Sequence, residues 1–309
     1  MKRNFTLLLG LGLSVLAGCS KEDAGNNDNE ALVPIELGAG VNVISRAVIS
    51  SGSEVKAGIA GWEAASAPTY AEAPSWGGSD DLEVITTTAN ETAQSVSWTS
   101  QRYYAPDGKT TYMKAWSPAG TFSIGNTVSF TNTDGSVDVL LAPVVSGSKT
   151  SKVSTPLAFR HMTSQIKFSV KKGEGLAEGT KIESITIKDA QLPTGFDLTK
   201  GIDDDGAVTY AAAADLTVPN IDGSKEISNT TAGDPVGDAV MIKPIASKTF
   251  TVDITTNNAS YTNKTVTVTT NQVLAGYAYE ITLTFGQAGI ELTATVADWK
   301  TAAGSAEIQ

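Results

Sequence analysis

The sequence predicts an all-β protein, organised as two antiparallel β-sandwich domains. Thr and Val are frequent, and both favour strands, whereas long runs of Leu, Glu, Lys and Ala at helical spacing are absent. Short alternating segments recur along the chain, with the turn signals Asp134-Gly135, Asp205-Gly206 and Asp222-Gly223 between them. Many short alternating strands separated by turns are typical of sandwiches.

The clearest predicted strand covers residues 33–43. A period of two places every second side chain on the same face of a strand. All the odd positions in this segment are apolar, namely Val33, Ile35, Leu37, Ala39, Val41 and Val43. Shorter strands are predicted at residues 166–170, 185–187, 250–254, 266–268, 281–285 and 290–296.

The length of 309 residues exceeds the usual size of one domain and favours two. The stretch Ser146–Ser151 is polar and lacks periodicity, so we expect the boundary there. This gives an N-terminal sandwich over residues 31–152 and a C-terminal sandwich over residues 153–309.

The first 18 residues have the pattern of a secretory signal. Lys2 and Arg3 precede a short apolar run, which is too short to span a hydrocarbon core of roughly 20 residues. The run ends in Leu16-Ala17-Gly18-Cys19, which resembles the bacterial lipobox. We therefore predict cleavage before Cys19 and lipidation of this residue. The alternative is an ordinary signal followed by an unrelated cysteine, which leaves an odd cysteine in an exported chain unexplained.

Residues 19–30 are predicted to be a lipidated flexible tether, because they are polar and lack aromatic residues. Two or more acyl chains anchor a protein stably, at about 0.8 kcal/mol per buried CH₂. Lys21-Glu22-Asp23 resembles the acidic export signal of surface lipoproteins in the Bacteroidota. The expected location is the outer face of the cell outer membrane.

The charge balance disfavours nucleic acid as a partner. Loss of Lys2 and Arg3 with the signal leaves 20 basic against 33 acidic residues, a net charge of −13. Phosphate binding needs clustered Lys and Arg, which an acidic mature chain does not suggest.

No catalytic site, cofactor or metal site is predicted. His161 is the only histidine and lies in a predicted strand without a nucleophile signature, so a hydrogen-bonded structural histidine is the favoured interpretation. Cys19 is the only cysteine and is expected to be acylated, which excludes a His/Cys zinc site. Asp203-Asp204-Asp205-Gly206 lacks the ligand spacing of an EF-hand and is interpreted as a charged turn.

Two stretches resemble the fimbrillin, or type V pilin, family of the Bacteroidales. Residues 156–168 are similar to the central strand of that family, and residues 276–285 with 296–299 resemble its closing pattern. Weaker similarities lie at 112–118 and 138–140. The resemblance implies two transthyretin-like sandwiches. It also implies export as a lipoprotein, cleavage after an arginine by a surface protease, and assembly into a fimbrium by donor-strand exchange with other pilin subunits.

Arg46 is the candidate processing site that this mechanism requires, because it directly follows the predicted strand at residues 33–43. A cut after Arg46 would release the lipid anchor and displace that strand. The alternative is an ordinary surface arginine. Candidate donors are Ile290, Leu292, Ala294 and Val296, or the tail Ala303–Gln309. The alternative for residues 290–296, which we favour from the sequence, is the last strand of its own domain.

The resemblance therefore implies a structural or adhesive subunit of a surface pilus, not an enzyme. Its expected partners are other subunits, an arginine-specific protease, the outer membrane through its lipid, and a host or bacterial surface receptor. Two alternatives stay open: a pilus anchor subunit, and a surface lipoprotein that binds glycans and never polymerises. The latter needs exposed aromatic residues, for which Trp62 and Trp76 are the candidates.

Overall fold

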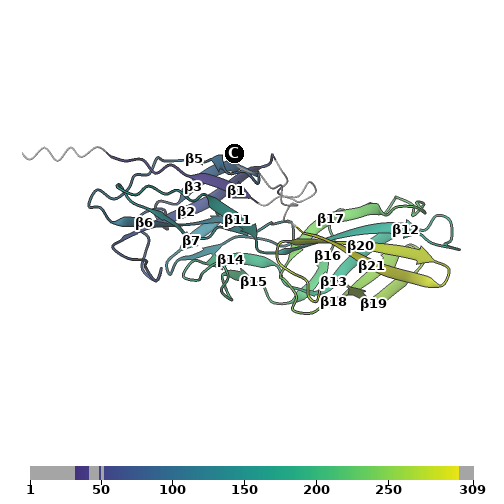
Figure 1. Ribbon diagram of the computed structural model, residues 1–309. Coiled ribbons are helices and arrows are strands. Elements are labelled where there is room, and N and C mark those ends of the chain that lie inside the picture. The colour runs from purple at the N-terminus through teal and green to yellow at the C-terminus, as the bar shows by residue number, and fades with distance from the viewer. Residues whose placement is uncertain (1–31, 42–48, 50–51, 299–309) are drawn as a thin grey trace, which may run out of the picture. The chain divides into compact units, whose positions relative to one another are not determined.

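All the regular structure in the computed structural model is β, in residues 32–41, 49 and 52–298, which the structure describes (Figure 1). This part of the chain contains no helix, and therefore none that is long and apolar enough to cross a membrane. The predicted all-β fold is confirmed. The strands form four sheets, one of nine strands and three of four strands. The transthyretin-like topology of two sandwiches stays a prediction.

The first sheet is built from residues before 162. Its strands are β1 (Gly38–Val41), β2 (Glu54–Ala64), β3 (Glu83–Thr88), β4 (Gln94–Ser95), β5 (Ser97–Trp98), β6 (Thr110–Ser117), β9 (Leu140–Leu141), β10 (Val145–Gly147) and β11 (Leu157–His161). Their order is β4-β1-β11-β9-β6-β2-β3-β5, with β10 paired to β6. Residues 94–98 pair with β1 through β4 and with β3 through β5, so they link the two ends of this sheet. One apolar cluster packs against this sheet and includes Ile59 of β2, Leu157 of β11 and Ile35, which precedes β1.

The second sheet combines two distant parts of the sequence. It contains β7 (Thr121–Ser123), β8 (Thr127–Ser129), β14 (Pro193–Asp197) and β15 (Val208–Tyr210), in the order β15-β14-β8-β7. A second apolar cluster joins it to the first sheet, with Trp62 and Trp116 from the first sheet and Phe122 and Phe196 from the second. We call these two sheets the N-terminal sheets.

The third and fourth sheets, here called the C-terminal sheets, share one apolar core. The third contains β12 (Ser164–Lys172), β17 (Asp234–Ile242), β20 (Tyr277–Gly286) and β21 (Gly289–Asp298), in the order β17-β12-β20-β21. The fourth contains β13 (Ile182–Ala190), β16 (Ala214–Thr217), β18 (Thr249–Thr256) and β19 (Ser260–Thr267), in the order β16-β13-β18-β19. Alternation along β18 buries Phe250, Val252 and Ile254 while their neighbours are half-buried, as a period of two requires.

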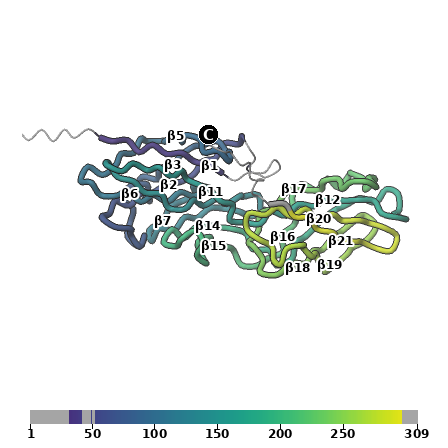
Figure 2. Tube along the Cα trace, viewed as in Figure 1, coloured from purple at the N-terminus to yellow at the C-terminus, as the bar shows by residue number. Residues whose placement is uncertain are grey.

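Strand pairing crosses the boundary expected between residues 152 and 153. β11 lies between β1 and β9 in the first sheet, and β14 pairs with β8 in the second. Figure 2 shows β14 and β15 on the same side as β7 of the N-terminal sheets, although β12 and β13 of the C-terminal sheets come before them in the sequence. The chain therefore enters the C-terminal sheets, returns to the N-terminal sheets and leaves them again.

The stretch 156–168, interpreted above as one central strand, forms two strands in different sheets. β11 ends at His161 and β12 begins at Ser164, so the single-strand interpretation is wrong. The two residues between them each make a different long-range bond: the Met162 N–H donates to Val139 O at 2.8 Å, and Thr163 O accepts from the Gly276 N–H at 2.9 Å. These bonds turn the chain from one sheet to the other.

Candidate functional site

We call residues 32–41 the leading segment. Its strand β1 lies within the first sheet with neighbours on both sides, whereas residues 33–37 are hydrogen-bonded only to the stretch 96–104 on one side. On one side β1 pairs in parallel with β11, with Ala39 opposite Leu157 and Val41 opposite Phe159. On the other side it pairs with β4, and Pro34 forms a bridge with Tyr103. Without this segment, both neighbours would present unpaired edges.

The odd positions of this segment point into the core of the first sheet. Ile35, Ala39 and Val41 are 0 % exposed and Leu37 is 6 % exposed, while Val33 is half-buried. Val43 lies outside the described residues. Burial of a large apolar side chain contributes roughly 1.5–3 kcal/mol, so Ile35, Leu37 and Val41 are a major part of what holds the segment in place.

The even positions Gly38 and Gly40 lie under a loop formed by residues 90–93. A Cβ atom at Gly40 would be 3.2 Å from Glu91 O, which is tighter than an ordinary contact. At Gly38 it would be 3.5 Å from the Cβ of Pro156, an ordinary contact. The absence of a side chain at residue 40 thus allows the loop to approach closely.

β21 is the edge strand of the third sheet and pairs with β20 from Gly289 to Asp298. Its alternating side chains Ile290, Leu292, Ala294 and Val296 are only half-buried, although they pack against the C-terminal core. The tail Ala303–Gln309 lies outside the described residues.

β21 and the leading segment have nearly the same sequence. Residues 35–41 are Ile-Glu-Leu-Gly-Ala-Gly-Val and residues 290–296 are Ile-Glu-Leu-Thr-Ala-Thr-Val, identical at five of seven positions. All four core-facing positions are identical, and the differences replace Gly38 and Gly40 with Thr293 and Thr295. This signal was present in the sequence, but the separate interpretation of each strand missed it.

Of the four arginines, Arg102 and Arg160 lie in the described residues, and both form ion pairs. Arg102 Nη2 is 3.0 Å from the buried carboxylate of Glu83 and 3.2 Å from the exposed carboxylate of Asp81, and its guanidinium lies 5.5 Å from the centre of the Trp76 ring. Arg160 pairs within β11 with Leu141 of β9 and forms an ion pair of 3.0 Å with Asp203. Arg46 and Cys19 lie outside the described residues.

His161 has the structural setting expected from the sequence. Its Nδ1 is 3.0 Å from the carboxylate of Asp138, and both side chains are 1 % exposed. A substrate cannot reach a pair so deeply buried. In the described residues, no three His, Cys, Asp or Glu side chains are grouped to hold a metal ion.

The expected exposure of Trp62 and Trp76 is wrong. They are 4 % and 6 % exposed, because Trp62 packs edge-on against Tyr70 and Trp76 packs in the same way against Trp98. Trp116 is fully buried. Among the described tryptophans, therefore, none forms the exposed platform that the glycan-binding alternative needs.

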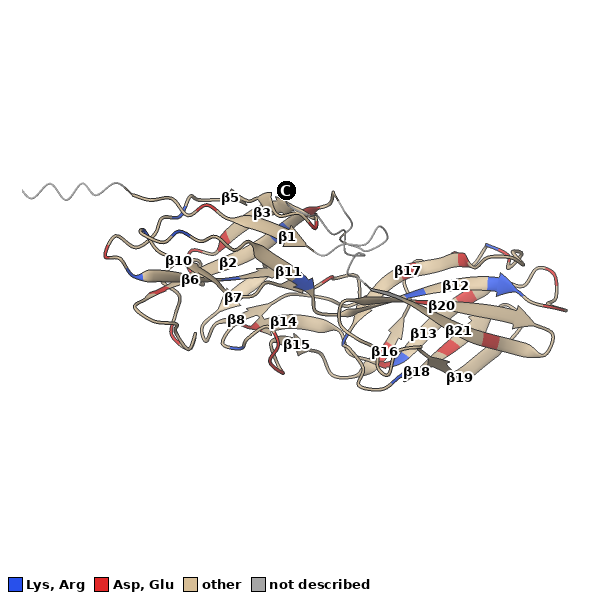
Figure 3. Ribbon diagram, in the orientation of Figure 1, with Lys and Arg blue, Asp and Glu red and all other residues tan. Residues whose placement is uncertain are grey.

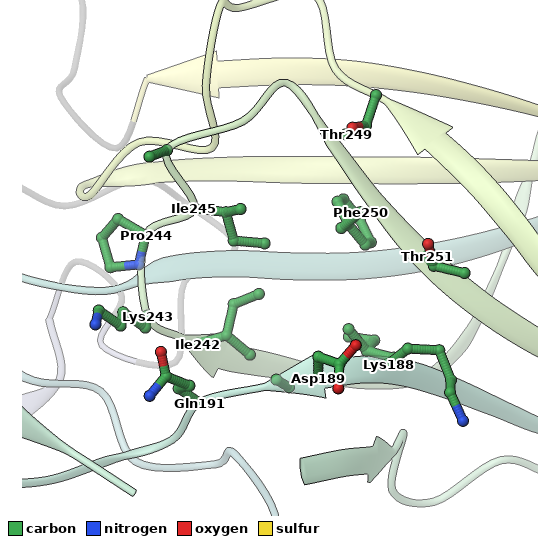
Figure 4. A pocket seen from close by; sticks show the side chains of 13 residues that line it. Lys188, Asp189, Gln191, Ile242, Lys243, Pro244, Ile245, Thr249, Phe250 and Thr251 are labelled. Carbon is green, nitrogen blue, oxygen red and sulfur yellow. The ribbon is translucent and has the colours of Figure 1, made fainter. Parts of the chain in front are cut away.

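Figure 3 shows Lys and Arg dispersed among Asp and Glu over the described strands. A pocket of about 430 Å³ opens beside the end of β13 and the start of β18. Figure 4 shows Ile242, Ile245 and Phe250 facing it, with Lys188 and Asp189 at its edge. Lys188 forms ion pairs with Asp215 and Asp253, so its charge is already partnered.

A family model described as fimbrillin-like matches residues 52–299 of the chain. The chain belongs to the fimbrillin-like family. The fold of this fimbrillin-like protein is similar to that of a candidate cell adhesion protein from Bacteroides uniformis, at a TM-score of 0.58 and 19 % identity, covering 87 % of this chain and 99 % of that one. A candidate cell adhesion protein from Bacteroides ovatus has a TM-score of 0.54 and 14 % identity, covering 88 % and 100 %. No curated protein sequence matches significantly.

Proposed function

We propose that this fimbrillin-like protein is a structural or adhesive pilus subunit that polymerises by donor-strand exchange after a protease cuts behind Arg46. Membership of the fimbrillin-like family supports the role of a non-enzymatic pilus subunit. The single observation that carries the exchange mechanism is the sequence match between residues 35–41 and 290–296.

The acceptor site is the slot occupied by Val33, Ile35, Leu37, Ala39 and Val41 before processing. The displaced strand that we propose continues to Val43, which lies outside the described residues. Loss of this segment leaves two edges of the slot without a partner: β11 on one side, and residues 94–104 on the other. It also uncovers the core positions of Ile35, Leu37, Ala39 and Val41. An incoming strand restores both the hydrogen bonds and the burial, as in β-strand addition.

The donor is β21 of a second copy. If it enters in the direction of β1, Ile290, Leu292, Ala294 and Val296 occupy the positions of the four buried side chains, and Ala294 lies opposite Leu157. These four side chains are half-buried in their own sheet, whereas the slot buries its occupants to between 0 and 6 % exposure. The contact is head-to-tail, so repetition generates a filament instead of a closed dimer.

The exchange also has a free-energy cost, which is the loss of the pairing between β20 and β21. β21 must leave β20, with which it pairs over ten residue positions. Thr293 and Thr295 are strand residues in both states, so their propensity does not offset that loss, whereas Gly38 and Gly40 make the displaced segment the weaker strand former. Thr295 at the position of Gly40 requires residues 90–93 to move by a few tenths of an ångström.

Acylation of Cys19 holds the uncut subunit on the outer membrane, and an arginine-specific surface protease releases it into the fimbrium. A surface receptor completes the adhesive role. If β21 stays on β20, the same chain donates no strand to a neighbour and acts as an anchor subunit. The pairing of β20 with β21 over ten residue positions favours this second function.

The test uses delipidated protein, residues 20–309, treated with an arginine-specific protease. We expect mass spectrometry to find a cut after Arg46 and electron microscopy to find filaments. Arg46→Lys is the matched control, because it keeps the charge and removes the cleavage site. Leu292→Asp should allow the cut but abolish filaments, since it places a charge in the slot.

A protein that is cut but stays monomeric would favour the anchor function. Resistance of Arg46 in the native protein would contradict the processing step.

A further inference from the structure

We propose that Arg102 is a second cleavage site, covered by residues 32–41 and exposed only while the slot is empty. The inference rests on the proposed strand exchange and adds a quality-control step, in which subunits that have received no donor strand are degraded. A subunit that has lost its leading segment and received no donor is cut again by the same class of arginine-specific protease and is removed from assembly.

The backbone around Arg102 is held by the leading segment. The Ile35 N–H donates to Arg102 O at 2.8 Å, and the Tyr104 N–H donates to Val33 O at 3.0 Å. Tyr103 forms the β-bridge with Pro34, and the side-chain amide of Gln101 donates to Ile35 O at 3.1 Å. Proteases bind their substrates as extended, unpaired chain, so these bonds withhold residues 101–104 from cleavage.

The side chain of Arg102 is held separately by ion pairs with Glu83 and Asp81. We call these ion pairs the side-chain lock. Its Nε and Nη2 both lie 3.0 Å from Glu83 Oε2, and the Arg102 side chain is 24 % exposed. Departure of residues 32–41 breaks the backbone bonds but leaves these ion pairs. The second cut is therefore slowed, and a donor strand that arrives promptly can cover the site first.

Arg160 is an internal control for cleavage at Arg102. It lies next to the same slot, but its own backbone partner is Leu141 of β9, and β1 pairs with Leu157, Ala158 and Phe159. Loss of the leading segment therefore leaves Arg160 within a paired strand. Cleavage at Arg102 without cleavage at Arg160 is the signature of the proposal.

The reaction is hydrolysis of the Arg102–Tyr103 peptide bond by water, which yields a carboxylate on Arg102 and an amine on Tyr103. The nick lies in the stretch 94–104 that forms one wall of the slot. A nicked wall cannot hold a donor strand in register, so the subunit is excluded from the filament.

The first experiment uses the uncut chain with Arg46→Lys, so that it does not depend on processing. Ile35→Ala is added to loosen the leading segment, and Ile290→Ala in a parallel sample is the matched control on β21. The rate of cleavage at Arg102 is followed by mass spectrometry, with hydrogen exchange at residues 33–41 as the measure of opening.

Because cleavage of a transiently open state follows its population, we expect Ile35→Ala to raise the rate at Arg102 by at least about tenfold. Ile290→Ala should leave it nearly unchanged, and Arg160 should stay intact in both. A synthetic peptide of residues 32–43 should slow the cut. Asp81→Asn, which weakens the side-chain lock, should speed it further.

No cleavage at Arg102 despite fast exchange at residues 33–41 would overturn the proposal. Equal cleavage at Arg102 and Arg160 would also overturn it, since it would indicate general unfolding. Either result is independent of whether Arg46 is processed or filaments form.

Discussion

The ammonium group of Lys114 donates a hydrogen bond of 2.6 Å to the carbonyl oxygen of Leu198. A second bond of 2.8 Å reaches Lys200 O, and the Nζ atom lies 3.8 Å from the centre of the Tyr70 ring. The two hydrogen bonds tie β6 of the first sheet to the residues that follow β14 of the second. Burial lowers the pKa of Lys114 to about 8, although Asp197 and Asp204 act in the opposite direction.

This lysine predicts a pH dependence of stability. Its folded pKa lies below its unfolded value, so the unfolded chain binds more protons between about pH 8 and pH 10.5. Within that window the free energy of unfolding should rise with pH, by at most about 1.4 kcal/mol per pH unit from this group. Urea unfolding at several pH values measures the slope. In Lys114→Met the rise attributable to this group should be absent; an unchanged slope contradicts the assignment.

Ile35→Ala should destabilise the uncut protein more than Ile290→Ala. Ile35 is fully buried, and truncation of such a side chain costs about 2–5 kcal/mol. Ile290 is half-buried at the sheet edge, so the same truncation should cost clearly less. Urea denaturation of the Arg46→Lys protein compares the two. Equal losses would show that the two strands are held equally firmly.

The two glycines of β1 should respond differently to threonine. Gly38→Thr meets only ordinary contacts and should stabilise the uncut protein by up to about 1 kcal/mol through strand propensity. Gly40→Thr places its Cβ 3.2 Å from Glu91 O, so it should stabilise less or destabilise. Thermal unfolding of both variants measures the difference. If Gly40→Thr were the more stable of the two, the loop at residues 90–93 would have to yield easily.

Residues 31–152 should not fold alone. That fragment lacks β11, which separates β1 from β9, and lacks β14, on which β8 pairs. Its expected behaviour is aggregation or a broad, non-cooperative unfolding curve, measured by circular dichroism. The longer fragment of residues 31–298, which keeps both strands, is the matched control and should unfold cooperatively. A sharp transition in the short fragment would support the boundary expected from the sequence.

Much of the fold could be predicted from the sequence because alternation is local. The period of two at Ile35, Leu37, Ala39 and Val41 correctly predicted one buried face. The same reasoning placed the strands around Phe250 and Ile281. Within the leading segment, however, only residues 38–41 form a regular strand. Residues 32–37 lie against loop residues and form only isolated bonds with them, such as the bridge between Pro34 and Tyr103.

What the pattern could not supply was long-range pairing. Nothing near Pro193 indicates that β14 adds to β8 instead of a neighbour in sequence. The burial of Trp62 and Trp76 was missed for a similar reason, since their partners Tyr70 and Trp98 lie across a loop and on another strand. The ion pairs of Arg102 likewise depend on a fold that brings Glu83 to it.

Three covalent connections join the N-terminal sheets to the C-terminal sheets in the described chain: β11 to β12, β13 to β14, and β15 to β16. A tensile load applied between these sheets is shared by three backbones in parallel, in contrast to two domains joined by one linker. One broken peptide bond among the three leaves the load path continuous. If the protein assembles into the filament proposed above, this arrangement gives mechanical redundancy within each subunit, separate from the strength of the contact between subunits.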